Sequence, residues 1–191
     1  MQSKRSGFSL VELVVVIVIV GLLAVAALPR FLDVTDSAKK ASVEGVAGGY
    51  ATGVLSARAQ WEAESRPSIT VNTETYNSVN YDGVEFWLTR AKNASNTDTG
   101  FRDGYPWAVK RAGDTSFPTA LTDDICVDLM ENLLQNPPAV EAAATASDSD
   151  NVKYSAQAEN DERCTYIQKV GGVDNQFVYE IKTGRVIVTL Q

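Results

Sequence analysis

The chain has 191 residues, enough for one folded domain and one additional segment. Apolar residues make up 45% and charged residues 21%, which allows a packed core and argues against extensive disorder. The formal net charge of -7 disfavours general binding to nucleic acid phosphates. The sequence has no histidine, which excludes Ser-His-Asp and Cys-His catalysis and removes the commonest metal ligand.

The first thirty residues contain a short polar stretch followed by a long apolar one. Residues 1–7 carry two charges, Lys4 and Arg5, and the apolar stretch from Phe8 to Leu28 is 21 residues long. As a helix it measures about 31 Å, close to the roughly 30 Å hydrocarbon core of a bilayer. The β-branched run from Val14 to Val20 favours a strand by propensity, but an isolated segment in lipid must satisfy its own backbone, which predicts a helix. Lys4 and Arg5 place the N-terminus in the cytoplasm.

The same composition also fits a cleavable secretory signal, because Ala24-Val25-Ala26 is a small-residue site of the A-x-A kind. Glu12 argues against this interpretation. A carboxylate near the start of an apolar stretch costs up to about 3 kcal/mol at the membrane centre, and a cleavable signal has no use for it. An ionisable residue in such a segment therefore indicates a function.

The segment Gly7-Phe8-Ser9-Leu10-Val11-Glu12-Leu13 resembles the type III signal of type IV prepilins. The resemblance implies that a membrane peptidase cleaves after Gly7 and methylates Phe8 as the new N-terminal residue. Glu12 would then be the fifth residue of the mature chain. Pro29 falls where many pilins carry a helix-kinking proline.

Cleavage would create an ammonium group on Phe8 inside an apolar environment. In a staggered filament, Glu12 of one subunit can face the ammonium of its neighbour and neutralise it. Such a pair fixes register more than it adds stability. The simpler alternative is that Glu12 is an interfacial carboxylate on a plain membrane anchor.

A continuing helix is predicted from Asp33 to about Glu64, ended by Ser65-Arg66-Pro67. One apolar stripe with a period of 3.6 residues predicts its contact with a following sheet: Val43, Val46, Tyr50, Val54, Ala57 and Trp61. The helix also carries a glycine strip, which comprises Gly45, Gly49 and Gly53 with Gly48 alongside. Such a strip allows close packing, either against the protein's own sheet or against the helix of a neighbouring subunit.

The next part of the chain predicts several short elements. Asp82-Gly83 indicates a turn into a strand at 84–88, and Gly104-Tyr105-Pro106-Trp107 indicates an ordered aromatic loop. Trp107 suits the face of a sugar but more commonly covers a small core. Thr122 is a predicted cap for a short helix through Leu134. Ala139–Asn151 is predicted to be a surface loop or frayed helix, and Asp148-Ser149-Asp150 is only a weak indication of calcium binding.

The C-terminal segments 177–182 and 185–190 predict an antiparallel hairpin around Thr183-Gly184. A two-residue loop pairs Ile181 with Val186, Tyr179 with Val188 and Phe177 with Leu190. A four-residue loop in the same register is the alternative.

Two cysteines occur in the chain, Cys126 and Cys164. In an exported protein an even count indicates one disulfide, whereas in the cytosol two free thiols are expected. The N-terminal segment favours export. A late cysteine pair also resembles the disulfide-bounded C-terminal region of pilins.

These elements predict an α+β chain with a long N-terminal helix packed on an antiparallel sheet, an architecture that resembles the type IV pilin fold. The expected parts are a leader (1–7), a transmembrane and assembly helix (8–29), a helix continuing into the globular domain (30–66) and a globular β domain (67–191). Leu28-Pro29-Arg30-Phe31-Leu32 and Val127-Asp128-Leu129 are most similar to pilins of the mannose-sensitive haemagglutinin (MSHA) system.

The resemblance implies a structural subunit, major or minor, of a type IV pilus for surface attachment. Its expected location is the inner membrane, with the globular domain in the periplasm, and then the extracellular pilus. The expected partners are other pilin subunits, the prepilin peptidase, the inner-membrane assembly platform and, before assembly, the membrane itself. No catalytic residue, cofactor, metal or nucleic acid is expected. The alternatives are a pseudopilin of a type II secretion system and a pilin-like ligand-binding module.

Overall fold

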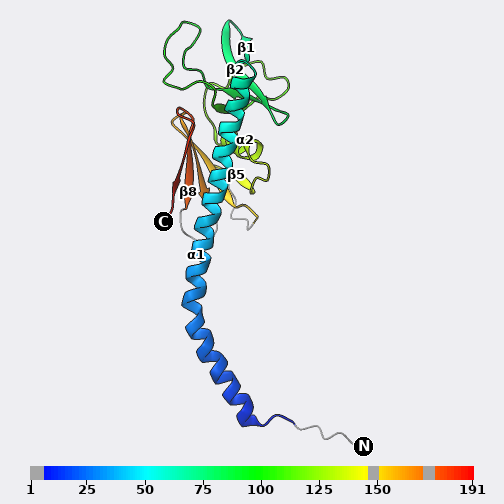
Figure 1. Ribbon diagram of the computed structural model, residues 1–191, viewed down its shortest axis with the longest axis vertical. Coiled ribbons are helices and arrows are strands. Elements are labelled where there is room, and N and C mark those ends of the chain that lie inside the picture. Colours follow the sequence, from blue (N-terminus) through cyan, green and yellow to red (C-terminus); the bar gives the residue numbers. More distant parts are fainter. Residues whose placement is uncertain (1–6, 146–150, 170–174) are drawn as a thin grey trace, which may run out of the picture. The chain divides into compact units, whose positions relative to one another are not determined.

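The computed structural model describes residues 7–145, 151–169 and 175–191. The chain divides into two compact units, residues 1–41 and 42–191, and the boundary falls within helix α1, Leu10–Ala63 (Figure 1). The described part of the first unit consists of residues 7–9 and the first part of α1. The strands and the second helix belong to the second unit.

Within the second unit, α1 buries one face along its length. Tyr50 and Val54 are fully buried and Val46 is half-buried. The buried face as a whole comprises Val43, Ala47, Tyr50, Gly53, Val54, Ala57 and Trp61. The predicted stripe therefore faces the core. The helix ends at Ala63, because Ser65 and Arg66 adopt positive φ angles of 64° and 60° that no helix continues.

In the described residues, the first sheet has four antiparallel strands in sequence order. They are β1 (Ser68–Val71), β2 (Glu74–Tyr81), β3 (Val84–Leu88) and β4 (Pro106–Val109). The predicted turn joins β2 to β3, with φ angles of 51° at Asp82 and 84° at Gly83. The prediction of a loop at 104–107 is wrong for Pro106 and Trp107, since β4 pairs with β3.

Helix α2 (Asp123–Leu133) follows, and the side chain of Thr122 caps it by accepting a hydrogen bond from the Ile125 N–H, as predicted. The described strands of the second sheet are β5 (Val140–Ala142), β6 (Tyr154–Glu159), β7 (Arg163–Gln168), β8 (Gln176–Glu180) and β9 (Arg185–Thr189), in that order.

Strand β5 corrects the prediction of a loop or frayed helix at 139–151. It pairs with β6 in parallel, whereas the other described neighbours in this sheet are antiparallel. Three residues carry little propensity of their own, so β5 depends on its neighbour in the sheet. Asp148-Ser149-Asp150 lies outside the described residues.

The C-terminal hairpin β8–β9 is present, but its predicted register is wrong. Tyr179 pairs with Val186 and Phe177 with Val188, so the loop has four residues, 181–184. Ile181 donates its N–H to Glu162 O (2.9 Å) instead of pairing with β9. The shift is two residues, which keeps the same side chains on the same face.

The centre of the core between α1, α2 and the second sheet consists of aromatic rings, and some of them carry buried, hydrogen-bonded hydroxyl groups. The Tyr50 ring lies 5.3–5.6 Å from the rings of Tyr166, Phe177 and Tyr179. The Tyr166 hydroxyl donates to the Cys126 carbonyl oxygen (2.8 Å), so the Tyr50 hydroxyl, 3.1 Å away, is the donor to Tyr166. Burial raises the pKa of all three tyrosines and keeps them neutral.

Cys126 of α2 and Cys164 of β7 form a disulfide, with Cα atoms 5.5 Å apart and a sequence separation of 38 residues. Both cysteines are fully buried. The predicted disulfide is therefore confirmed, and so is the predicted fold class: a long apolar N-terminal helix with antiparallel sheet structure and a disulfide in the C-terminal part.

Candidate processing and assembly site

The start of α1 is held by a reciprocal pair of hydrogen bonds between Ser9 and Glu12. The Ser9 hydroxyl accepts from the Glu12 N–H (3.2 Å), and the Glu12 carboxylate accepts from the Ser9 N–H (2.8 Å). This is a capping box, which satisfies two backbone donors at a helix N-terminus. Ser9 is not among the residues predicted from the sequence, although the S-x-x-E spacing before an apolar run is the signal for it.

The segment before the helix is accessible. Gly7, Phe8 and Ser9 lie outside α1 and are exposed, and the Phe8 side chain is 86% exposed. The predicted cleavage bond between Gly7 and Phe8 is thus in non-helical backbone, which a peptidase can bind in extended form. Among the ion pairs between described residues, none involves Glu12.

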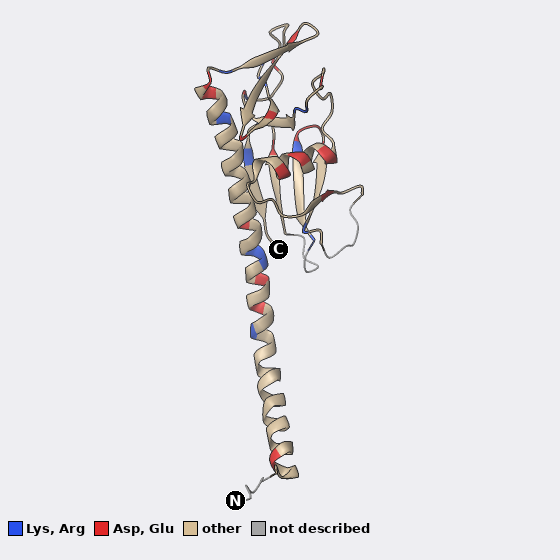
Figure 2. Cartoon of the chain, turned by 90° about the vertical axis from the view of Figure 1, so that its right-hand side faces the viewer, with Lys and Arg blue, Asp and Glu red and all other residues tan. Residues whose placement is uncertain are grey.

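The first part of α1 exposes an unbroken apolar surface. Its most apolar 18-residue window has a mean hydropathy of 3.1 with none of it buried, so by length and composition the helix can cross a membrane. Figure 2 shows this stretch as uncharged between the acidic residue near the helix start and the basic residue that follows Pro29. Exposed apolar surface of this extent marks contact with lipid or with protein.

Pro29 lies inside α1. Because proline lacks an N–H, it cannot donate to the carbonyl oxygen of Val25, and one helical hydrogen bond is missing there. A kink at this position remains a prediction.

The glycine strip faces two environments. A Cβ at Gly49 would touch the Leu134 side chain at 3.0 Å, and one at Gly53 would overlap the backbone carbonyl of Leu133. A Cβ at Gly45 or Gly48 would meet nothing within 4 Å. The close packing at Gly49 and Gly53 is therefore against the C-terminal end of α2 and not against the sheet, which was one of the two predicted alternatives. Contact with the helix of a neighbouring subunit stays a prediction. Gly45 and Gly48 leave that side of the helix open.

A pair of substitutions separates the two environments. Gly53→Ala is expected to lower the free energy of unfolding by about 1–3 kcal/mol, because backbone must move to admit the methyl group. Gly48→Ala is expected to raise it by up to about 1 kcal/mol through helix propensity alone. Both are measured by denaturant unfolding of the full chain in detergent micelles, followed by tryptophan fluorescence. Equal effects of the two variants would contradict the assigned packing.

Two neighbouring cations at the end of β4, Lys110 and Arg111, have acidic partners. Lys110 pairs with Glu85 (2.8 Å) and Arg111 with Asp128 (2.7 Å), so they form no free basic patch. Burial raises the pKa of Asp128, and the guanidinium of Arg111 opposes this rise.

Comparison with known proteins points to the same segment. The family model of the prokaryotic N-terminal methylation motif matches residues 2–28. Over 44 residues the chain is 50% identical to the type IV narrow pilus major component PilA5 of Thermus thermophilus. That match covers 23% of this chain and 38% of the relative's own length. No solved structure matches the chain.

The chain is therefore similar to pilins in its N-terminal methylation motif and over a stretch of 44 residues.

Proposed function

We propose that this chain is a structural subunit of a type IV pilus that is cleaved after Gly7, methylated on Phe8 and assembled through α1. The observation that carries the proposal is the place of Glu12, in the first turn of an exposed apolar helix that begins just after the exposed Gly7-Phe8 bond. In the precursor, the Glu12 carboxylate accepts a hydrogen bond from the Ser9 N–H, as part of the capping box. Cleavage then supplies a cation on Phe8, one residue before the cap.

The proposed course runs from membrane to fibre. The precursor lies in the inner membrane as a single span, with Lys4 and Arg5 in the cytoplasm and the domain in the periplasm. The prepilin peptidase processes it, the inner-membrane assembly platform adds it to other pilin subunits, and the fibre extends outside the cell. The subunit is structural and not enzymatic.

A finer assignment rests on the resemblance to MSHA pilins, and within that system to the minor pilin MshB. The alternative is a pseudopilin of a type II secretion system. The Cys126–Cys164 disulfide favours a pilin, because subunits of a fibre exposed outside the cell gain more from a covalent cross-link. A role in surface attachment belongs to this same proposal.

The test uses three variants that separate charge from capping. Glu12→Val removes the negative charge and the capping side chain together. Glu12→Gln removes the charge but keeps the capping geometry. Ser9→Ala removes the capping hydroxyl and keeps the charge of Glu12. If the Phe8 ammonium of a neighbour needs the carboxylate, both Glu12 variants should incorporate into sheared fibres at least about tenfold less than wild type, which is about 1.4 kcal/mol. Ser9→Ala should incorporate normally.

Two measurements separate the steps. Mass spectrometry of the membrane fraction reports cleavage after Gly7 and methylation of Phe8, and immunoblotting of sheared fibres reports incorporation. Normal cleavage with low incorporation supports the proposal. Full incorporation of Glu12→Gln would show that the charge of Glu12 is not needed for assembly. Absence of the wild-type chain from sheared fibres would contradict the pilus role itself.

A further inference from the structure

A cavity of about 290 Å³ opens in the unit formed by residues 42–191, at the end of the first sheet. It lies just below the usual size range of sites for drug-sized ligands, so it has room for a smaller molecule. Its walls include four aromatic residues, one cation and several hydroxyls, notably Tyr76, Arg90, Phe101, Trp107, Phe117 and Thr119.

The aromatic side of the cavity is a connected set of rings. Tyr76 and Phe117 stack with centroids 4.5 Å apart and an interplanar angle of 7°. The Trp107 ring lies 5.5 Å from Phe117 and 5.2 Å from Phe101. Tyr76, Phe101 and Phe117 are only half-buried. Half-buried rings around an opening give a ligand an apolar wall to lie against.

Polar groups stand beside the rings. Trp107 is only 7% exposed, and its indole N–H is a buried donor with no hydrogen-bond partner among the described residues. Because this N–H is closed to solvent, it offers a ligand in the cavity no hydrogen bond. Thr119 is exposed at the cavity. The Thr119 hydroxyl is thus a polar group that a ligand can reach, and it can bond to an oxygen atom of the ligand.

The charges at the cavity exclude other classes of ligand. Arg90 pairs with Glu74 (2.5 Å), and this hydrogen bond lowers the pKa of the Glu74 carboxyl. The guanidinium is thus compensated, which leaves little attraction for an anion. Arg90 also lies 4.2 Å over the Tyr76 ring, where a ligand cation would otherwise stack. Since neither an anion nor a cation is favoured here, we expect a ligand without net charge.

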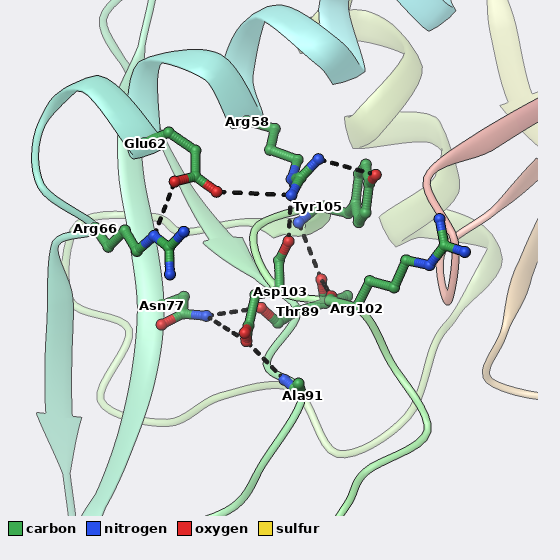
Figure 3. Close-up of polar contacts among 9 residues, drawn as sticks. All are labelled: Arg58, Glu62, Arg66, Asn77, Thr89, Ala91, Arg102, Asp103 and Tyr105. Atoms are coloured by element: carbon green, nitrogen blue, oxygen red, sulfur yellow. Dashed lines mark hydrogen bonds and ion pairs between the residues drawn. The ribbon is translucent and has the colours of Figure 1, made fainter.

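A second cavity of about 370 Å³ adjoins the first at Arg90, which lines both. Asn77 and Asp103 line it too, and they are fixed by hydrogen bonds: Asn77 donates to Thr89 O (2.9 Å) and Asp103 accepts from the Ala91 N–H (2.7 Å) (Figure 3). A ligand long enough to extend from the first cavity into the second would contact the amide of Asn77 and the carboxylate of Asp103.

We propose that the aromatic cavity binds a neutral saccharide, with one sugar ring against the part of the wall formed by Phe101, Trp107 and Phe117, since Phe117 and Arg90 cover the two faces of Tyr76. A sugar ring combines an apolar C–H face with a rim of hydroxyls, which are the two features that this lining can contact. The proposal does not depend on polymerisation, so its failure leaves the pilus role untouched.

Binding is tested by calorimetric titration of the full chain with maltotriose, cellotriose and raffinose, three neutral trisaccharides that differ in linkage. The micelles are formed from a detergent without a sugar headgroup, since such a headgroup would compete. At least one trisaccharide is expected to bind at concentrations up to about 10 mM. Its affinity should not change between low and high salt, because no net charge is recognised. No binding by any of the three, or a loss of affinity in salt, would overturn the proposal.

Two variants test whether the trisaccharide binds in the aromatic cavity. Phe117→Ala removes one aromatic wall and Thr119→Trp fills the mouth of the cavity, and each should weaken binding at least about tenfold, or 1.4 kcal/mol. Thr115→Trp, in the same loop and outside the cavity lining, is the matched control and should bind as wild type. Circular dichroism checks that each variant folds. Wild-type affinity in the folded Thr119→Trp variant would place the sugar elsewhere and refute the site.

Discussion

Replacing both Cys126 and Cys164 by alanine is expected to lower the free energy of unfolding of the 42–191 unit by about 4 kcal/mol. The bond links residues 38 positions apart in sequence, and opening a loop of this length gives the unfolded chain about that much additional conformational freedom. Alanine is chosen because both positions are fully buried and a serine hydroxyl would need a partner there. A loss of this size is a large part of the stability of an ordinary domain.

The measurement is denaturant unfolding of the full chain in micelles under non-reducing conditions. The three tryptophans, Trp61, Trp87 and Trp107, all lie buried in the 42–191 unit, so their fluorescence reports its unfolding. Wild type with a reductant present serves as the control and should approach the double variant. A loss below about 1 kcal/mol by both routes would contradict the structural role of the bond.

Tyr50→Ala is expected to cost about 3–5 kcal/mol, the range for losing a large aromatic side chain from a core. Its ring contacts Tyr166, Phe177 and Tyr179, and its hydroxyl reaches the polar chain that ends on the carbonyl of Cys126. Tyr50→Phe keeps the ring and should cost only about 1 kcal/mol, because Tyr166 retains its own bond to that carbonyl.

Leu55→Ala is the matched control, since Leu55 lies on the same helix and is 56% exposed. Its effect should stay within about 0.5 kcal/mol. All three variants are unfolded in urea, with the midpoint and slope fitted together. If Tyr50→Ala costs no more than Leu55→Ala, the aromatic centre does not hold α1 in this unit.

The sequence by itself determined the features that depend on near neighbours in the chain. The apolar run that follows Phe8, the end of α1 at Ser65-Arg66 and the cap at Thr122 each depend on a few consecutive residues. The capping box of Ser9 and Glu12 was not predicted, although it is equally local and its S-x-x-E spacing lies in four consecutive residues. With two cysteines in the chain, the disulfide partner was fixed once export was inferred.

Only the tertiary structure decided the features that depend on distant partners. Strand β5 forms because its backbone pairs with that of β6. The register of the β8–β9 hairpin is shifted because the Ile181 N–H donates to the carbonyl oxygen of Glu162 and not to β9. Gly53 faces α2 rather than the sheet, and the aromatic wall joins Tyr76 to Phe117 across 41 positions of sequence. Periodicity shows which side of an element is buried. It does not show what covers that side, because the covering residues are brought there by the packing of the whole chain.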